Sequence, residues 1–133
     1  MQAKDRGVIQ AWIVDDDDEM SLAVRLMLRM LGVQTEIFRE ARSASRMLLS
    51  GRKPDVLILD INMPEVSGID MLEFVRRTDS LKGLPIVMLS SETTDVQVDE
   101  ALAKGANAFV FKPVTVEELE GALAKVLPKR RTT

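Results

Sequence analysis

The sequence predicts an α/β fold in which helices cover both faces of a five-stranded parallel sheet. Apolar runs alternate five times with helical segments, which is the chain order of a parallel sheet with right-handed crossovers. The clearest strand, residues 55–60, has a continuous apolar interior, as expected for a strand buried on both faces. Four of the five runs end in a polar or charged residue, which predicts a functional edge where parallel strands end.

Capping and breaking residues set the expected element boundaries. The expected strands are residues 8–14, 33–38, 55–60, 86–90 and 107–111. The expected helices are residues 18–31, 41–50, 67–77, 94–104 and 115–127. Pro85 can open the fourth strand, because proline is tolerated at a first strand position. The expected helix stops are Gly32, Gly51, Gly105 and Pro128. The expected N-caps are Asp18, Ser67, Thr94 and Thr115, the last two in capping boxes with Gln97 and Glu118.

The composition excludes several classes of function. A chain of 133 residues with 46% apolar residues is enough for one domain, and we expect a single domain over 1–133 with its core at about 8–127. The net charge of -3 argues against nucleic-acid binding. The absence of Cys and His removes disulfides, Cys or His zinc sites and His-dependent nucleophiles. No secretory signal or membrane-length apolar run is present, so we expect a cytoplasmic protein without membrane contact.

The polar residues at the strand ends indicate phosphoryl chemistry. Strand one ends in Asp15 and Asp16, strand three in Asp60, strand four in Ser90, and strand five is followed by Lys112. Three neighbouring carboxylates repel one another unless a hard cation such as Mg2+, with Mn2+ as a substitute, lies between them. One carboxylate can then act as a nucleophile toward a phosphoryl group, while the ammonium and hydroxyl groups stabilise its oxygens.

Each of these residues also has a simpler explanation. The aspartate run 15–18 could be a solvated lead into a helix, and Asp60 could be a turn residue. Ser90 could simply end a strand, and Lys112 could be a surface charge. All these explanations would have to hold at once for the site to be absent.

Four motifs, in order, resemble the response-regulator receiver family over about residues 8–127. They are Ile13-Val14-Asp15-Asp16, the run from Leu57 to Pro64 together with Gly68, Val87-Met88-Leu89-Ser90, and Phe111-Lys112-Pro113. The resemblance implies a flavodoxin-like, doubly wound sheet in the order 2-1-3-4-5 with five helices. It also implies a two-component phosphorelay switch, not an enzyme acting on a separate substrate.

The resemblance also implies a role for each site residue. Asp60 would be the phosphoacceptor. The metal ligands would be Asp15, Asp16, Asp60 and the backbone carbonyl of Asn62. Ser90 and Lys112 would contact the phosphoryl group, Ser90 and Phe109 would form the switch, and the Lys112–Pro113 peptide would be cis.

Three residues depart from the common family pattern. Ser90 stands where Thr is more frequent, Ser91 where Ala or Gly is common, and Phe109 where Tyr is frequent. A Phe109 ring can still turn, but it has no hydroxyl to bond the loop after strand four. Asn62 and Glu92 occupy positions that tune phosphoryl lifetime in the family.

The resemblance implies a donor and an output surface. The donor would be a sensor histidine kinase or a histidine phosphotransfer protein, and the output surface would be residues 94–127. The largely apolar first helix suggests a partner or homodimer surface. The basic tail, residues 128–133, could be a natural end or the start of a linker to an output domain.

Three other functions compete with this interpretation. A haloacid-dehalogenase-type phosphatase would need an acid two residues after its nucleophile, where Asn62 stands. A degenerate receiver would act as a binding module without accepting phosphate. A flavodoxin would need a hydroxyl-rich phosphate loop after strand one, where this chain is acidic.

Overall fold

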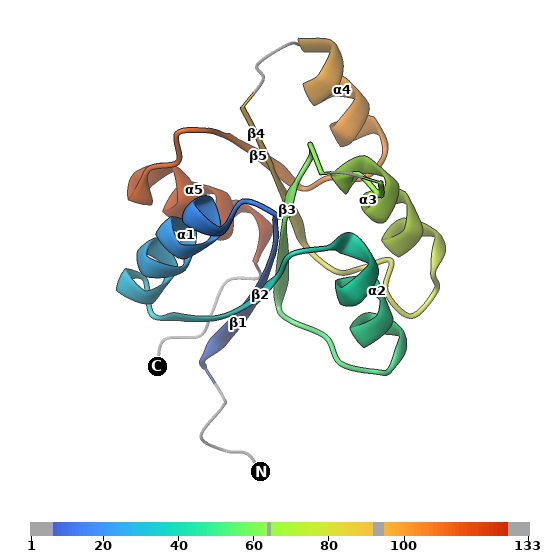
Figure 1. Cartoon of the computed structure of the whole chain (residues 1–133), viewed down its shortest axis with the longest axis horizontal. Coiled ribbons are helices and arrows are strands. Elements are labelled where there is room, and N and C mark those ends of the chain that lie inside the picture. The colour runs from blue at the N-terminus through green and yellow to red at the C-terminus, as the bar shows by residue number, and fades with distance from the viewer. Residues whose placement is uncertain (1–6, 64, 92–94, 128–133) are drawn as a thin grey trace.

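The sheet has the predicted number of strands, and they lie in the predicted order. A computed structural model describes residues 7–63, 65–91 and 95–127. All pairings between its five strands are parallel, in the order β2-β1-β3-β4-β5 (Figure 1). The strands are β1 (Ile9–Val14), β2 (Val33–Phe38), β3 (Val56–Asp60), β4 (Ile86–Ser90) and β5 (Ala108–Phe111). The predicted fold class and strand order are therefore confirmed.

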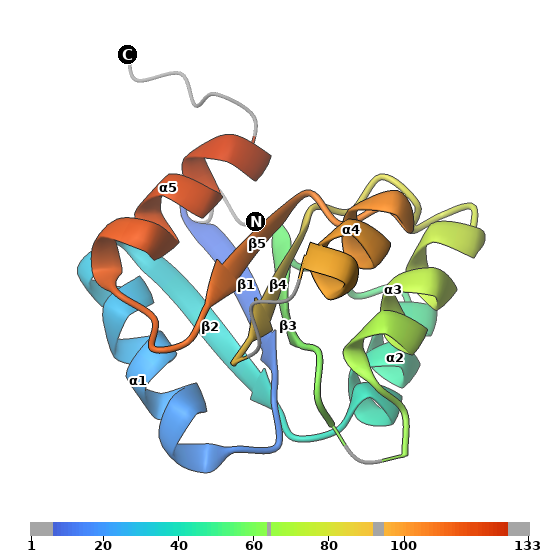
Figure 2. The ribbon, with the colours of Figure 1, turned by 90° about the horizontal axis from the view of Figure 1, so that it is seen from above.

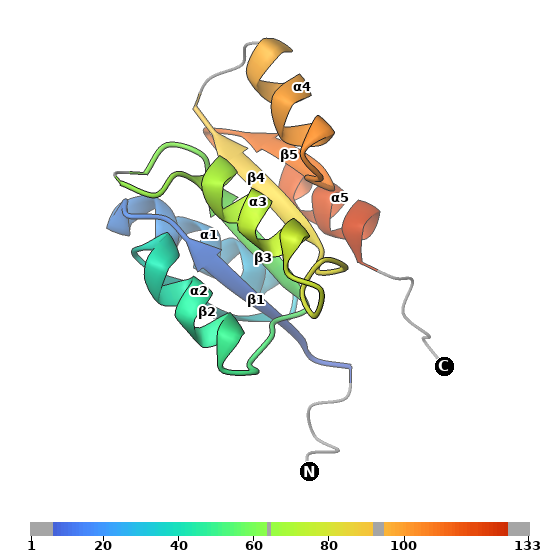
Figure 3. The same cartoon turned by 90° about the vertical axis from the view of Figure 1, so that its right-hand side faces the viewer.

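Five helices cover the two faces of the sheet. They are α1 (Asp18–Met30), α2 (Ala41–Leu49), α3 (Gly68–Arg77), α4 (Asp95–Ala103) and α5 (Val116–Val126). Figures 2 and 3 show α1 and α5 on one face and α2, α3 and α4 on the other. Leu57 and Leu59 of β3 face the α2–α3 side, whereas Val56 and Ile58 face the α1–α5 side. Because both faces are covered, every position of this strand is apolar until Asp60.

The observed start of α1 differs from the sequence prediction. Asp17, not Asp18, caps α1, because the Asp17 side chain accepts the hydrogen bond of Met20 N. Four consecutive aspartates offered several candidates, and the Asp17 backbone is the one held extended, with its N–H bonded to Asp15 Oδ1.

The predicted caps of α3 and α5 are present. Ser67 forms a complete capping box with Asp70. Thr115 accepts the hydrogen bond of Glu118 N. The predicted Thr94 cap lies outside the described residues.

Gly68 sets the path of the chain between β3 and α3. A Cβ at this position would lie 2.3 Å from the carbonyl oxygen of Asp60. The Gly68 N–H also donates to Ile61 O at 3.1 Å. Only glycine lets the start of α3 approach β3 this closely, so Gly68 fixes the loop that follows Asp60.

The parallel strands bring the predicted site residues to one edge. Asp60 is in register with Leu89, and Ser90 is in register with Phe111. The Lys112 N–H donates to Ser90 O at 2.8 Å, which extends this pairing by one residue. Within the described ranges, no helix has the length and apolar character needed to cross a membrane.

Candidate functional site

Three carboxylates meet at the carboxyl edge of the sheet. Asp15, Asp16 and Asp60 each offer an oxygen, and these oxygens lie within 4.8 Å of one another. Asp15 and Asp60 are buried, with 0% and 3% exposure, whereas Asp16 is more open to solvent. The apolar strands β1 and β3 hold the two buried carboxylates in place, since each directly follows a run of fully buried residues.

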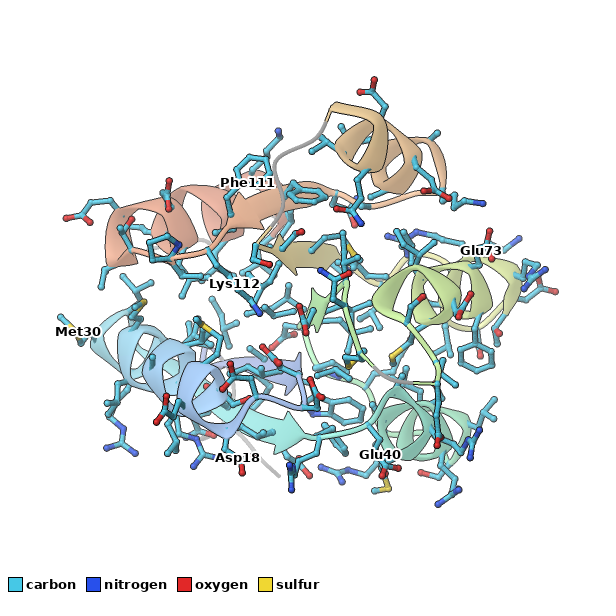
Figure 4. All side chains as sticks on the ribbon, turned by 45° about the horizontal axis from the view of Figure 1, so that its top comes forward. Asp18, Met30, Glu40, Glu73, Phe111 and Lys112 are labelled. Carbon is cyan, nitrogen blue, oxygen red and sulfur yellow. The ribbon has the colours of Figure 1, made fainter. Side chains whose placement is uncertain are left out.

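Lys112 supplies one positive charge to this group. Its Nζ lies 3.2 Å from Asp60 Oδ1 and 3.6 Å from Asp15 Oδ2, and its side chain is only 16% exposed. Figure 4 shows Lys112 reaching from the end of β5 toward the middle of the sheet edge. One ammonium group facing three carboxylates leaves an excess of negative charge at this edge.

Burial and the neighbouring charges change the pKa of Asp15. Together they raise this pKa from 3.8 to about 6: burial is the largest cause and the Asp60 carboxylate adds to it, whereas the Asp17 N–H and Lys112 lower it. Asp15 Oδ2 is buried and accepts no hydrogen bond from the residues that the structure describes. A buried carboxylate oxygen that lacks a hydrogen bond and lies among three acidic groups fits a hard divalent cation, which prefers oxygen ligands. The acidic cluster is therefore consistent with a metal site.

Ser90 ends β4 fully buried at the same edge. Its Oγ lies 3.5 Å from Oε1 of Gln97 in the first part of α4, and this contact was not predicted. The sequence assigned Gln97 only to a capping box. Its contact with Ser90 depends on how α4 is oriented over the sheet, which local pattern does not reveal.

Arg39 is a second residue that sequence reasoning missed. It follows β2, the strand without a predicted site residue, and its Nε lies 3.2 Å from Asp18 Oδ1. Its NH2 group donates to the carbonyl oxygen of Asp16 at 3.4 Å. Together with the bond from Asp15 N to Phe38 O at 3.0 Å, Arg39 ties the aspartate loop to the end of β2. The sequence signal that could have identified Arg39 was a single basic residue directly after a predicted strand.

The other predicted residues lie around this edge. Asn62 lies in the loop after β3 with its side chain exposed. Phe109 is partly buried against the α2–α3 core, and its ring centroid is 5.0 Å from that of Phe111. The Lys112–Pro113 peptide bond is cis. Glu92 lies outside the described residues. The metal-ligand role of Asn62 and the switch role of Phe109 stay predictions.

Comparison with known proteins identifies the family. The family model described as "Response regulator receiver domain" matches residues 11–124. The chain belongs to this family. As a receiver domain it is a signalling protein and not a classical enzyme, which sets aside the phosphatase and flavodoxin alternatives.

Individual relatives show where such receiver domains occur. The chain is 37% identical over 118 residues to the chemotaxis protein CheY of Pseudomonas aeruginosa, covering 88% of this chain and 94% of that protein. It is 30% identical to the transcriptional regulatory protein AfsQ1 of Streptomyces coelicolor, covering 86% of this chain but 49% of that protein. The structure of the Vibrio cholerae chemotaxis protein CheY4 is similar, with a TM-score of 0.83 and 30% identity over 91% of this chain and all of that one.

Proposed function

We propose that this receiver domain accepts a phosphoryl group on Asp60 and changes conformation in response. The placement of Asp60 carries this proposal. It ends β3 almost fully buried, beside two further carboxylates and 3.2 Å from the ammonium group of Lys112. A carboxylate with a fixed cation beside it can act as a nucleophile, and charge on the incoming phosphoryl oxygens is stabilised there.

Membership of the family supports a phosphohistidine donor. In the transfer, a bond forms between an Asp60 oxygen and phosphorus, while the bond from phosphorus to the donor nitrogen breaks and leaves its electron pair on the imidazole. Mg2+, or Mn2+ in its place, would be held by Asp15, Asp16, Asp60 and the Asn62 carbonyl and would neutralise charge on the phosphoryl oxygens. Lys112 then exchanges part of its contact with Asp60 for the phosphoryl group, and the Ser90 hydroxyl donates to a phosphoryl oxygen.

We also propose the partners and setting that the family suggests. The donor is a sensor histidine kinase or a histidine phosphotransfer protein, and residues 94–127 face a downstream protein or an attached output domain. Thr94, at the start of that range, lies outside the described residues. The chain acts as one domain in the cytoplasm, and a homodimer through α1 is the proposed form of self-association.

Intact-mass spectrometry tests the acceptor. Wild type incubated with acetyl phosphate should gain one phosphoryl group in Mg2+ and none in chelator, and Asp60→Asn should gain none while its circular dichroism stays unchanged. Asp55→Asn, directly before β3 at the opposite edge of the sheet, is the matched control and should label like wild type. Full labelling of Asp60→Asn would refute the assignment.

A binding module that does not accept phosphate is the second candidate. It would show no adduct in any condition, as would an acceptor that loses its phosphoryl group too quickly to trap. Beryllofluoride, which imitates a bound phosphoryl group, separates the two. Saturable binding that needs Mg2+ and Asp60 would indicate a short-lived acceptor, and absence of binding would indicate a module.

A further inference from the structure

β2 forms an open edge of the sheet. It pairs with β1, and no strand in the described part of the chain lies on its other side. Phe38 O accepts a hydrogen bond from Asp15 N, directly after β1, at 3.0 Å, so the backbone groups of Phe38 point toward β1. The N–H and C=O groups of one strand residue point to the same side, and this side alternates along the strand. The backbone groups of Thr35 and Ile37 therefore point outward, and no other described backbone group pairs with them.

Two arginines of α1 lie beside this open edge. Arg25 and Arg29 are four residues apart and so lie on the same side of the helix. Together with Val33, Gln34 and Thr35 of β2 they line a groove of about 330 Å3. α1 leads from the end of β1 to the start of β2, so it runs alongside β2 (Figure 2). Among the described residues, neither guanidinium group forms an ion pair.

The opposite face of β2 has a cation that is already paired. Side chains alternate between the two faces of a strand, so Thr35 points toward α1 and Glu36 points away from it. Glu36 Oε1 lies 2.7 Å from the guanidinium group of Arg52, which neutralises the charge on that face. The two arginines of α1 have no such carboxylate, so the free positive charge beside β2 lies on its α1 face.

We propose that the open edge of β2 binds an extended acidic segment of another protein as a sixth strand. The backbone of this segment pairs with the outward groups of Thr35 and Ile37, and two of its carboxylates bind Arg25 and Arg29. Acids two residues apart on one face of a strand are separated by about 6–7 Å. Side chains four residues apart on a helix are separated by about 5–6 Å, so each carboxylate can meet one guanidinium group. The backbone bonds supply affinity, and the arginines select for acidic residues.

Two other occupants fit this edge less well. A free oxyanion would meet the arginines but would leave the outward backbone groups of β2 without partners. A second copy of this chain, pairing through its own β2 about a two-fold axis, would bring the arginines of both copies to the same face of the joined sheet. Four like charges would then repel one another there, which disfavours self-pairing. An acidic strand satisfies both the backbone groups and the guanidinium groups.

Fluorescence anisotropy with synthetic peptides tests the proposal. The probe is a labelled, end-blocked heptapeptide of alternating glutamate and valine, titrated with the full chain at low salt, and it should bind saturably. A peptide with glutamine in place of glutamate should bind more weakly, because it lacks the charge. A peptide of the same composition with adjacent glutamates places its acids on both faces and should also bind more weakly. Equal binding of the two glutamate peptides would reduce the effect to general charge attraction and overturn the added strand.

Substitution of the arginines tests which charges bind the acids. Arg25→Gln and Arg29→Gln should each weaken binding of the alternating peptide by about 1.5- to fivefold, the range for one exposed ion pair. Arg46→Gln removes the same charge from an exposed position in α2 outside the groove, so it is the matched control and should bind like wild type. Equal weakening by all three changes would mean that net charge alone matters and would overturn the site.

The backbone pairing has tests of its own. Thr35→Pro removes one outward N–H, which an edge strand tolerates, so its circular dichroism should stay unchanged while binding weakens roughly two- to tenfold. Amide hydrogen exchange read by nuclear magnetic resonance needs no variant. In the free protein Thr35 and Ile37 should exchange quickly and Glu36 slowly, and saturating peptide should slow Thr35 and Ile37 without changing Glu36. Unchanged exchange at Thr35 and Ile37, or no binding of the alternating peptide, would overturn the proposal.

Discussion

At the scale of the residue, Asp15 shows that the candidate site lowers the stability of the fold at neutral pH. Its carboxyl group is buried, one of its oxygens accepts no hydrogen bond from the described residues, and its pKa is raised to about 6 by burial and by the nearby Asp60. Between pH 3.8 and about 6 the folded protein therefore binds a proton that the unfolded chain has released. The free energy of unfolding falls as the pH rises through this window, because the unfolded state binds fewer protons.

We expect Asp15→Asn to be more stable than wild type above pH 6 in chelator, by up to about 3 kcal/mol. The asparagine oxygen can still accept from Asp17 N, so the change removes mainly the charge. The gain should shrink as the pH falls toward 4, and urea unfolding at several pH values measures it. Asp99→Asn, exposed on α4, should show no such pH-dependent gain. A difference that is independent of pH would mean that charge is not the cause.

At the scale of the element, Gly68 couples the start of α3 to the acceptor strand. A Cβ at this position would lie 2.3 Å from Asp60 O, and that atom belongs to the backbone, so it cannot turn aside. Gly121 in α5 is the matched control, because a Cβ there meets nothing within 4 Å.

We expect Gly68→Ala to lower the free energy of unfolding by about 2 kcal/mol or more and to slow Mg2+-dependent labelling of Asp60. Gly121→Ala should raise the free energy of unfolding by about 0.5–1 kcal/mol, because alanine is the better helix former. Urea unfolding of both variants gives the comparison. Equal effects of the two changes would show that contact with Asp60 does not matter.

The elements also show which predictions the sequence could support. The continuous apolar run of β3 and the strand-terminal aspartates were enough to predict the sheet and three members of the site, because they follow from position along a strand. The cap of α1 was misplaced by one residue, since four adjacent aspartates have equal propensity. Arg39 and Gln97 were missed because each side chain contacts a residue outside its own segment of the chain. The direction in which a side chain points toward another segment depends on packing, which the local sequence pattern does not reveal.

At the scale of the whole molecule, the exposed ridge of α1 bears on the proposed homodimer. Leu22, Leu26 and Met30, spaced four residues apart on one side of the helix, are 53%, 56% and 74% exposed. Arg25 and Arg29 lie along one flank of this ridge. In an antiparallel two-fold pair of such helices the same flank of each copy meets, so arginines would face arginines.

A homodimer through this ridge should therefore tighten as salt rises. Analytical ultracentrifugation between about 0.01 M and 1 M salt, over which the screening length falls from about 30 Å to about 3 Å, measures the effect. Leu26→Glu should return the protein to monomer, whereas Lys125→Glu, exposed on α5, should not. A monomer at every salt and protein concentration would exclude the dimer.

The directions of β1 and α5 have a practical consequence. The strands run toward the acidic edge, so β1 begins at the opposite edge, and α5 ends there too (Figure 3). Leu127 and Asp55 line one groove of about 810 Å3 at that edge. Ends that lie together and away from a functional edge are suited to circular permutation. A permuted gene that joins these two segments through a short linker could open the chain beside α4 instead. A fluorescent protein inserted at that opening would turn the conformational change proposed on phosphorylation of Asp60 into an optical signal.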